Sequence, residues 1–305
     1  MPTSVEKKNT FKDAWDTIVS PDTHPTRFRS LHEIEYPTFM EKVLTQDPAY
    51  VTSVTRSLYA GDAHIIRGAL SKAFIGEIKR QTVEYCSDKP STFHKMLEGC
   101  SDFQRIIDAE ATKKYSFKMI KRSCYFFPWN DDPLKLFKPL WERWGLLKFL
   151  GGRPIDEYER NTPKDGVVDR IQIVCYPSGA GMLDLHSDPY LLQPLMLAVC
   201  MSKRGEDFEA GGLYVMGPGN KRIEIEDQME VGDMLVFYPT VVHGVAVIDP
   251  HKPVDWGAWQ GRWFLSMASN ASDEVKNRHS PYAVKLDDPA HVMTSGRMTA
   301  NDEEV

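Results

Sequence analysis

Three residues in the second half of the chain have the types and spacing of a metal site. His186 and Asp188 stand two residues apart, between a glycine-rich turn and Pro189. On a β-strand such residues point to one face, so both could enter a barrel interior. His243, after a second apolar run, could supply a third ligand. Two histidines and one carboxylate leave adjacent positions of an iron ion open for a cosubstrate and O2. Alternatively, His186 and Asp188 are ordinary polar residues of a loop, and His243 is a capping histidine at a barrel rim.

Arg262 begins an otherwise apolar run, "RWFLSM". Strand alternation places Arg262, Phe264 and Ser266 on one face. A guanidinium that points into a barrel needs an anionic partner, because burying an unpaired charge is costly. The carboxylate of a cosubstrate would satisfy it through two parallel hydrogen bonds. A protein carboxylate or exposure to solvent are the alternatives.

Short β-like runs in the second half of the chain must position these side chains. Each run is bounded by Gly, Pro, Asn or Asp, and they span residues 167–176, 194–202, 211–217, 222–226, 233–238, 244–248 and 262–267. So many short strands predict an antiparallel sandwich or barrel. Helical periodicity predicts helices over residues 68–86 and 132–152, and residues 115–127 alternate like a strand.

The expected organisation is one integrated catalytic domain of class α+β. Residues 166–270 form the β core, and residues 61–165 form a mainly helical support and lid region with one or two strands of the later sheet. Residues 1–60 are expected to be an arm with short helices. Residues 271–305 are expected to be a polar tail whose last residues are mobile.

Composition limits the classes of partner. The chain has 305 residues, of which 42% are hydrophobic and 26% are charged, which is typical of a globular protein. A net charge of −6 argues against nucleic acid as the main partner. Five scattered cysteines without a CxxC pair predict free thiols in a reducing compartment. No apolar run reaches the roughly 18 residues of a membrane span, so we expect a cytoplasmic protein without a membrane partner. The sequence predicts no oligomeric state.

Four motifs, in order, resemble the Fe(II)/2-oxoglutarate-dependent dioxygenases, and in particular their prolyl-4-hydroxylase-like branch. The motifs are "RIQIVCYPSGAGMLDLHSD", "FEAGGLYV", "VGDMLVFYPTVVHGV" and "GRWFLSM". They lie between residues 169 and 268, about a third of the chain. The resemblance implies a double-stranded β-helix, or jelly-roll barrel, with an α-rich N-terminal half packed against it.

The same resemblance implies the roles of the site residues. His186, Asp188 and His243 would bind the catalytic iron, and Arg262 would bind the distal carboxylate of 2-oxoglutarate. Tyr176 or Ser266 would add a hydroxyl to that carboxylate. The family frequently has Arg-x-Ser, whereas here the serine is the fourth residue after the arginine. Halogenating relatives replace the carboxylate ligand by a small residue, so an aspartate at this position favours an oxygenase.

The implied activity is oxidation of an unactivated C–H bond of a small molecule, either amino-acid-like or a secondary metabolite. Hydroxylation, desaturation and ring closure all fit, with 2-oxoglutarate and O2 converted to succinate and CO2. Three alternatives remain: a peptide or protein hydroxylase, a non-catalytic barrel that binds or senses a ligand, and a cupin-like metal enzyme without 2-oxoglutarate. Residues that could contact a substrate, or simply pack, are Tyr125, Phe126, Phe127, Trp129, Trp141, Trp144, Tyr190 and Gln193.

Overall fold

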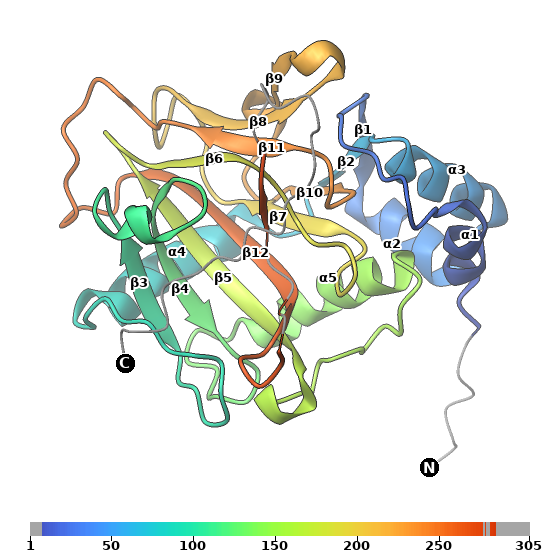
Figure 1. Ribbon diagram of the computed structural model, residues 1–305, viewed down its shortest axis with the longest axis horizontal. Coiled ribbons are helices and arrows are strands. Elements are labelled where there is room, and N and C mark those ends of the chain that lie inside the picture. Colours follow the sequence, from blue (N-terminus) through green and yellow to red (C-terminus); the bar gives the residue numbers. More distant parts are fainter. Residues whose placement is uncertain (1–7, 277, 279–280, 285–305) are drawn as a thin grey trace.

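The computed structural model describes residues 8–276, 278 and 281–284, so the predicted mobility of the last residues lies outside the described part. Its strands are connected into one 13-stranded sheet, in which β4 (Met119–Phe126) joins a larger part, the large sheet, to a smaller part, the small sheet. Figure 1 shows the two parts packed into one body. The core of the large sheet has the order β5-β12-β7-β10, and that of the small sheet the order β6-β11-β8-β9. All of these neighbours are antiparallel. The bounds are β5 (Val167–Pro177), β6 (Met182–Ser187), β7 (Met196–Cys200), β8 (Gly212–Met216), β9 (Arg222–Glu224), β10 (Met234–Phe237), β11 (His243–Ala246) and β12 (Gly261–Ala271).

The chain passes repeatedly from one sheet to the other, and this topology confirms the predicted double-stranded β-helix and the α+β class. Residues 61–165 contribute three strands rather than one or two, and the N-terminal segment contributes another. Short runs of about five residues carry little periodic signal, which is why the sequence did not reveal all of them. A last strand pairs with β6. These are β1 (Leu31–Glu35), β2 (Ala63–Arg67), β3 (Phe103–Ile107), β4 (Met119–Phe126) and β13 (Tyr282–Ala283).

Both predicted helices form, but each begins later than expected. The Ser71 side chain caps the first, accepting a hydrogen bond from the Phe74 backbone. The Asp132 carboxylate accepts from the backbone of Leu136 and of Phe137, which holds the preceding residues in a turn. The helices are α1 (Thr10–Ile18), α2 (Tyr36–Thr45), α3 (Pro48–Tyr59), α4 (Lys72–Ser87) and α5 (Phe137–Leu150), with short 3-10 turns η1 (Ala111–Lys114), η2 (Pro163–Asp165), η3 (Pro218–Asn220) and η4 (Glu226–Gln228). No helix in the described ranges is long and apolar enough to cross a membrane.

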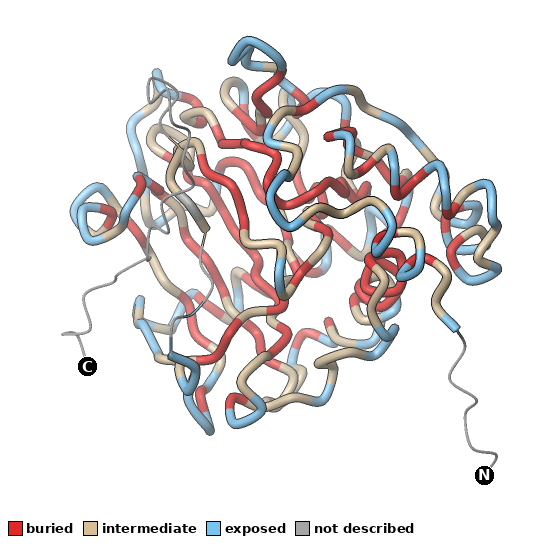
Figure 2. Tube along the Cα trace, turned by 45° about the vertical axis from the view of Figure 1, so that its right-hand side comes forward, coloured by how far each residue is buried: buried red, intermediate tan, exposed pale blue. Residues whose placement is uncertain are grey.

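The large sheet has two different faces. Its outer face is covered by α4 and α5, and Trp263, Leu265 and Met267 of β12 are almost completely buried there. The alternate residues Phe264 and Ser266 lie on the inner face, where they stay partly exposed. Figure 2 shows the buried residues concentrated in the central strands. The inner face therefore keeps accessible surface inside an otherwise packed fold.

A buried ion pair fastens α5 to the outer face. The Lys148 ammonium contacts the Asp169 carboxylate of β5 and also the Glu157 carbonyl. The second oxygen of Asp169 accepts from the Ser269 hydroxyl at 2.8 Å. Burial raises the pKa of Asp169, although Lys148 opposes that change. This carboxylate consequently depends on its partners to stay charged.

We expect Lys148→Met to lower the free energy of unfolding by about 3–5 kcal/mol, because it leaves the Asp169 charge buried without a partner. The double variant Lys148→Met with Asp169→Leu should recover most of that loss. Urea denaturation measures both. Lys113→Met, which removes an exposed partner of Glu110, serves as the control, with a change below about 0.5 kcal/mol. A single-variant loss no larger than the control's would contradict the prediction.

Candidate metal centre

Strand register brings the three predicted ligands together. His243 of β11 lies directly opposite His186 of β6 in the antiparallel pair, with ring centroids 4.2 Å apart. Asp188 follows the end of β6, and its backbone N–H donates to the Pro239 carbonyl at 2.9 Å. One ligand atom from each of the three residues lies within 4.8 Å of the others, and all three residues are buried.

Backbone carbonyls fix the orientation of both imidazoles. His186 Nδ1 lies 3.0 Å from the Asp184 carbonyl oxygen, and His243 Nδ1 lies 2.9 Å from that of Val241. A carbonyl only accepts, so each Nδ1 carries the proton and each Nε2 keeps its lone pair. The Nε2 atoms of His186 and His243 lie 3.9 Å and 3.5 Å from Asp188 Oδ2. Both free lone pairs are thus directed to the carboxylate side, as metal ligands require.

The surroundings keep these groups in a ligand state. Burial, and then the nearby His243, hold the pKa of His186 well below its ordinary value, so the imidazole is neutral. Burial raises the pKa of Asp188, a cost that a bound cation would offset. Phe117 stacks on His186 at 5.3 Å, and Phe237 meets His243 edge-on at 5.0 Å. A shielded set of two imidazoles and one carboxylate fits a divalent ion such as Fe(II).

Arg262 lies on the inner face with a protein carboxylate beside it. Its Nε donates to Glu226 Oε2 at 2.7 Å, and the same oxygen accepts from the Leu213 backbone at 2.7 Å. Burial opposes the arginine charge, but the Glu226 carboxylate outweighs it and raises the pKa of Arg262. A Cβ on Gly212 would lie 2.7 Å from Glu226 Cγ, so this glycine lets Glu226 approach. The sequence left three environments open for the Arg262 guanidinium: a cosubstrate carboxylate, a protein carboxylate or solvent. The structure shows a protein carboxylate, that of Glu226.

The Glu226 contact leaves most of the guanidinium available. It uses Nε alone, and the terminal nitrogens of Arg262 have no hydrogen-bond partner among the described residues. Tyr176, opposite Arg262 in the β5–β12 pair, is fully buried, and its hydroxyl has no partner either. Burial raises the pKa of Tyr176, so the hydroxyl stays protonated and able to donate. An orphaned hydroxyl of this kind costs about 1–3 kcal/mol. An anionic oxygen between Tyr176 and Arg262 would satisfy both.

Ser266 shares the inner face but not the position of Arg262. It stands four residues further along β12, which corresponds to roughly 13 Å at strand spacing. Its cross-strand neighbours are Gln172 and Ala198. The structure therefore brings Tyr176, and not Ser266, to the arginine.

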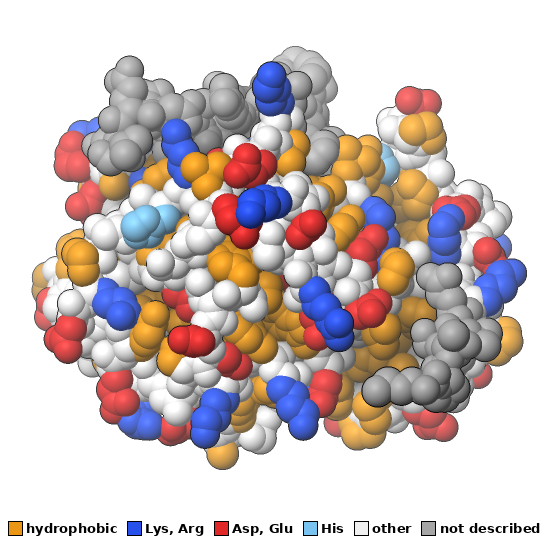
Figure 3. All heavy atoms as spheres, turned by 90° about the horizontal axis from the view of Figure 1, so that it is seen from below, with side chains coloured by type: hydrophobic (Ala, Val, Ile, Leu, Met, Phe, Trp, Pro, Cys, Tyr) orange, Lys and Arg blue, Asp and Glu red, His pale blue; other side chains and the backbone are white. Residues whose placement is uncertain are grey.

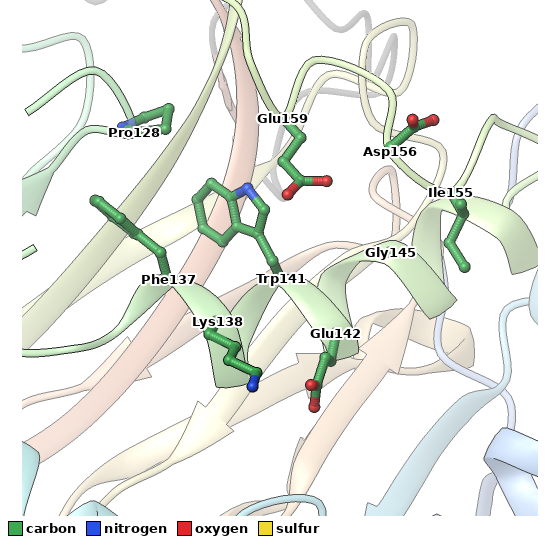
Figure 4. Close-up of a pocket in the computed structure, with 9 residues that line it drawn as sticks. All are labelled: Pro128, Phe137, Lys138, Trp141, Glu142, Gly145, Ile155, Asp156 and Glu159. Atoms are coloured by element: carbon green, nitrogen blue, oxygen red, sulfur yellow. The ribbon is translucent and has the colours of Figure 1, made fainter. Parts of the chain in front are cut away.

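The candidate substrate residues mostly pack elsewhere. Tyr190 contacts His24 in a tilted ring pair with centroids 3.9 Å apart, and Gln193 accepts from the Ser269 backbone at 3.0 Å. Trp141 lines a groove of about 500 Å³ along α5, which contains none of the metal-site residues (Figure 4). Tyr125 alone of this set lies on the inner face, where Gln172 donates to its hydroxyl at 3.3 Å. Core positions are taken by Phe126, Phe127 and Trp144, and Trp129 stacks on Phe127.

Other inner-face residues were missed from the sequence. Glu226 was missed because pairing between distant residues leaves no local pattern. Lys121 and Arg170 share the inward parity of Tyr125 and Gln172 on β4 and β5, so alternation could have identified them.

On the molecular surface, Figure 3 shows acidic and basic side chains interspersed over one face.

Comparisons with known proteins give distant structural likenesses. No family profile and no curated protein matches the chain. A full-length Neurospora crassa protein in complex with alpha-KG aligns with 13% identity and a TM-score of 0.46, over 80% of this chain and 86% of that chain. A Pseudomonas putida prolyl-4-hydroxylase aligns with 11% identity and a TM-score of 0.42, over 67% and 90%. A Trichoplax adhaerens prolyl hydroxylase in complex with a hypoxia inducible factor peptide fragment aligns with 15% identity and a TM-score of 0.45, over 76% and 92%.

We expect His186→Ala and His243→Ala each to abolish stoichiometric metal binding, because two remaining donors hold a divalent ion weakly. Anaerobic equilibrium dialysis against Fe(II), followed by elemental analysis, measures the bound metal. His251→Ala is the matched control, since this exposed histidine contacts Glu209 outside the site. Full metal content in either site variant would reject the ligand assignment.

Proposed function

We propose that this chain is an Fe(II)/2-oxoglutarate-dependent oxygenase that oxidises a C–H bond of a small molecule. The observation that carries the proposal is the buried set of His186, Asp188 and His243, together with Arg262 and a Tyr176 hydroxyl that has no partner in the described part of the chain. A metal ligand set explains the first group. A cosubstrate with a carboxylate explains Arg262 and the Tyr176 hydroxyl. A simple metal hydrolase or a cupin-like enzyme without 2-oxoglutarate would not need these two residues.

Each residue has a separate task in this proposal. His186, Asp188 and His243 would hold Fe(II), which together with 2-oxoglutarate and O2 supplies the oxidising chemistry and yields succinate and CO2. Arg262 and Tyr176 would bind the distal carboxylate of 2-oxoglutarate. Glu226 holds the Arg262 guanidinium by its Nε, so the terminal nitrogens are presented in a fixed orientation. The rings of Phe117 and Phe237 limit the access of water to the ligands.

The position of β13 favours a small substrate over a peptide. Ala283 pairs with His186, and the Val284 backbone donates to the Leu185 carbonyl at 3.1 Å. The chain's own C-terminal segment thus occupies the edge of β6 beside the metal ligands. A peptide could not add to this edge as a strand unless β13 left it.

We expect the protein with Fe(II) and 2-oxoglutarate under anaerobic conditions to show the visible metal-to-ligand charge-transfer absorption of a chelated 2-oxo acid. Both reagents are required, so Fe(II) alone and Fe(II) with succinate are the controls. The reason is that the keto acid end must reach an iron ion whose remaining positions are open. If no absorption develops at saturating reagents, the proposed function is wrong.

Tyr176→Phe should weaken 2-oxoglutarate binding about tenfold, which corresponds to one lost hydrogen bond of about 1.4 kcal/mol. The same change should not destabilise the ligand-free protein, because no described residue forms a hydrogen bond with this hydroxyl. Arg262→Ala should weaken 2-oxoglutarate binding more strongly while metal binding remains. Titrations of the charge-transfer absorption and thermal unfolding measure these effects. Unchanged 2-oxoglutarate affinity in Tyr176→Phe would remove this residue from the site.

A further inference from the structure

We propose that Lys121 and Arg170 bind a carboxylate group of the substrate, so that the substrate is a small carboxylate. This inference rests on the proposed function, because it treats the metal centre as the place of reaction. The two side chains come from the adjacent strands β4 and β5 and share the inner face of the large sheet. They are not part of the metal ligand set or of the Arg262 and Tyr176 pair.

Strand register places Lys121 beside the metal centre. Ile120 of β4 pairs with Met182 of the small sheet, whereas Arg122 pairs with Cys175 of the large sheet. Lys121 lies between them, at the corner where the two sheets meet. Its side chain has the parity of Ser123 and Tyr125, whose hydroxyls both accept from Gln172 on the inner face. Lys121 therefore faces the space between the metal ligands and the large sheet.

Arg170 approaches the same space from the other end. Asp169 points to the outer face and its ion pair with Lys148, so the next residue, Arg170, points inward. Its guanidinium carbon lies 4.9 Å from the centre of the Tyr125 ring. Burial lowers the pKa of Lys121 most, and among its charged neighbours Arg170 lowers it further while Asp188 raises it. Arg170 thus extends along the inner face to Tyr125, and Lys121 lies on the same face of β4 toward the metal site.

Neither cation forms an ion pair with a carboxylate in the described part of the chain. No carboxylate of the described residues lies within ion-pair distance of Lys121 or Arg170, and Arg170 Nε is buried without a hydrogen-bond partner. A terminal nitrogen of Arg170 donates to the neutral amide oxygen of Gln172 at 3.4 Å, which supplies no charge. By contrast, Lys148 and Arg262 are each paired with a buried carboxylate. Two inward cations without an anion are costly unless a ligand supplies one.

Charge balance indicates a carboxylate rather than a phosphate. Fe(II), Asp188 and 2-oxoglutarate together would carry one negative charge, and the Arg262–Glu226 pair is neutral. Lys121 and Arg170 add two positive charges, which leaves one positive charge to be balanced. A carboxylate supplies one negative charge, whereas a phosphate monoester carries about 1.5–2 at neutral pH. The partly exposed rings of Tyr125 and Phe264 on the same face suit an apolar body attached to that carboxylate.

Benzoate and benzamide test this inference, because they have nearly the same shape and differ in charge. We expect ligand-observed NMR titrations of the full chain, without added metal, to show benzoate binding about tenfold more tightly than benzamide, as one charge-assisted hydrogen bond predicts. In Lys121→Met and in Arg170→Met this preference should disappear. Lys118→Met removes an exposed lysine near the start of β4 and should keep it.

Three results would overturn the inference. The first is equal binding of benzoate and benzamide to the unmodified chain. The second is a preference for benzoate that survives both Lys121→Met and Arg170→Met. The third is a loss of 2-oxoglutarate affinity in Lys121→Met that is as large as its loss of benzoate affinity. The last would make Lys121 part of the cosubstrate site. Because benzoate binding is measured without metal, it is independent of the charge-transfer experiment. A benzoate preference in a chain that binds no iron would reject the oxygenase and keep the carboxylate site.

Discussion

The pairing of β6 with β11 is the constraint on which the site depends. It places His243 opposite His186, although the two lie in separate motifs of the sequence, and the Asp188–Pro239 backbone hydrogen bond fixes the third ligand against the same turn. A slip of one residue would turn the His243 side chain to the other face. The register shifts just after His243, where a Cβ on Gly244 would lie 2.8 Å from the Tyr214 hydroxyl oxygen. Glycine therefore permits the close strand packing that holds the ligands together.

In the large sheet, residues that point to the outer face stabilise the fold, and the alternate residues, which point to the inner face, carry the candidate site. Asp169 points outward and binds Lys148 of α5, while the next residue, Arg170, points inward. Trp263 packs on the outer side next to Arg262, whose guanidinium contacts Glu226 on the inner side. Adjacent residues of one strand can therefore have unrelated roles. The helices supply the apolar burial that lets the inner face remain polar.

Strand patterns predicted much of this arrangement. Alternation correctly placed Arg262, Phe264 and Ser266 on one face, and the short runs after residue 166 became the jelly-roll strands. Features set by distant contacts were not predictable. Glu226 is close to Arg262 only because its turn, η4, contacts β8, which faces β12, and β13 can pair with β6 only because β4 pairs with no more of that edge than Met182 and Leu183. Ser266 was assigned from a family motif, but its distance along β12 separates it from Arg262.

The two cationic groups of the inner face differ in how their charge is compensated. Glu226 already neutralises Arg262, so a carboxylate bound there, as proposed, would gain orientation from the guanidinium more than net charge. Lys121 and Arg170 have no such partner among residues 8–276, 278 and 281–284, so an anion bound there would relieve an existing repulsion. If both proposals hold, the paired arginine would select its carboxylate by geometry, and Lys121 and Arg170 would select theirs by charge.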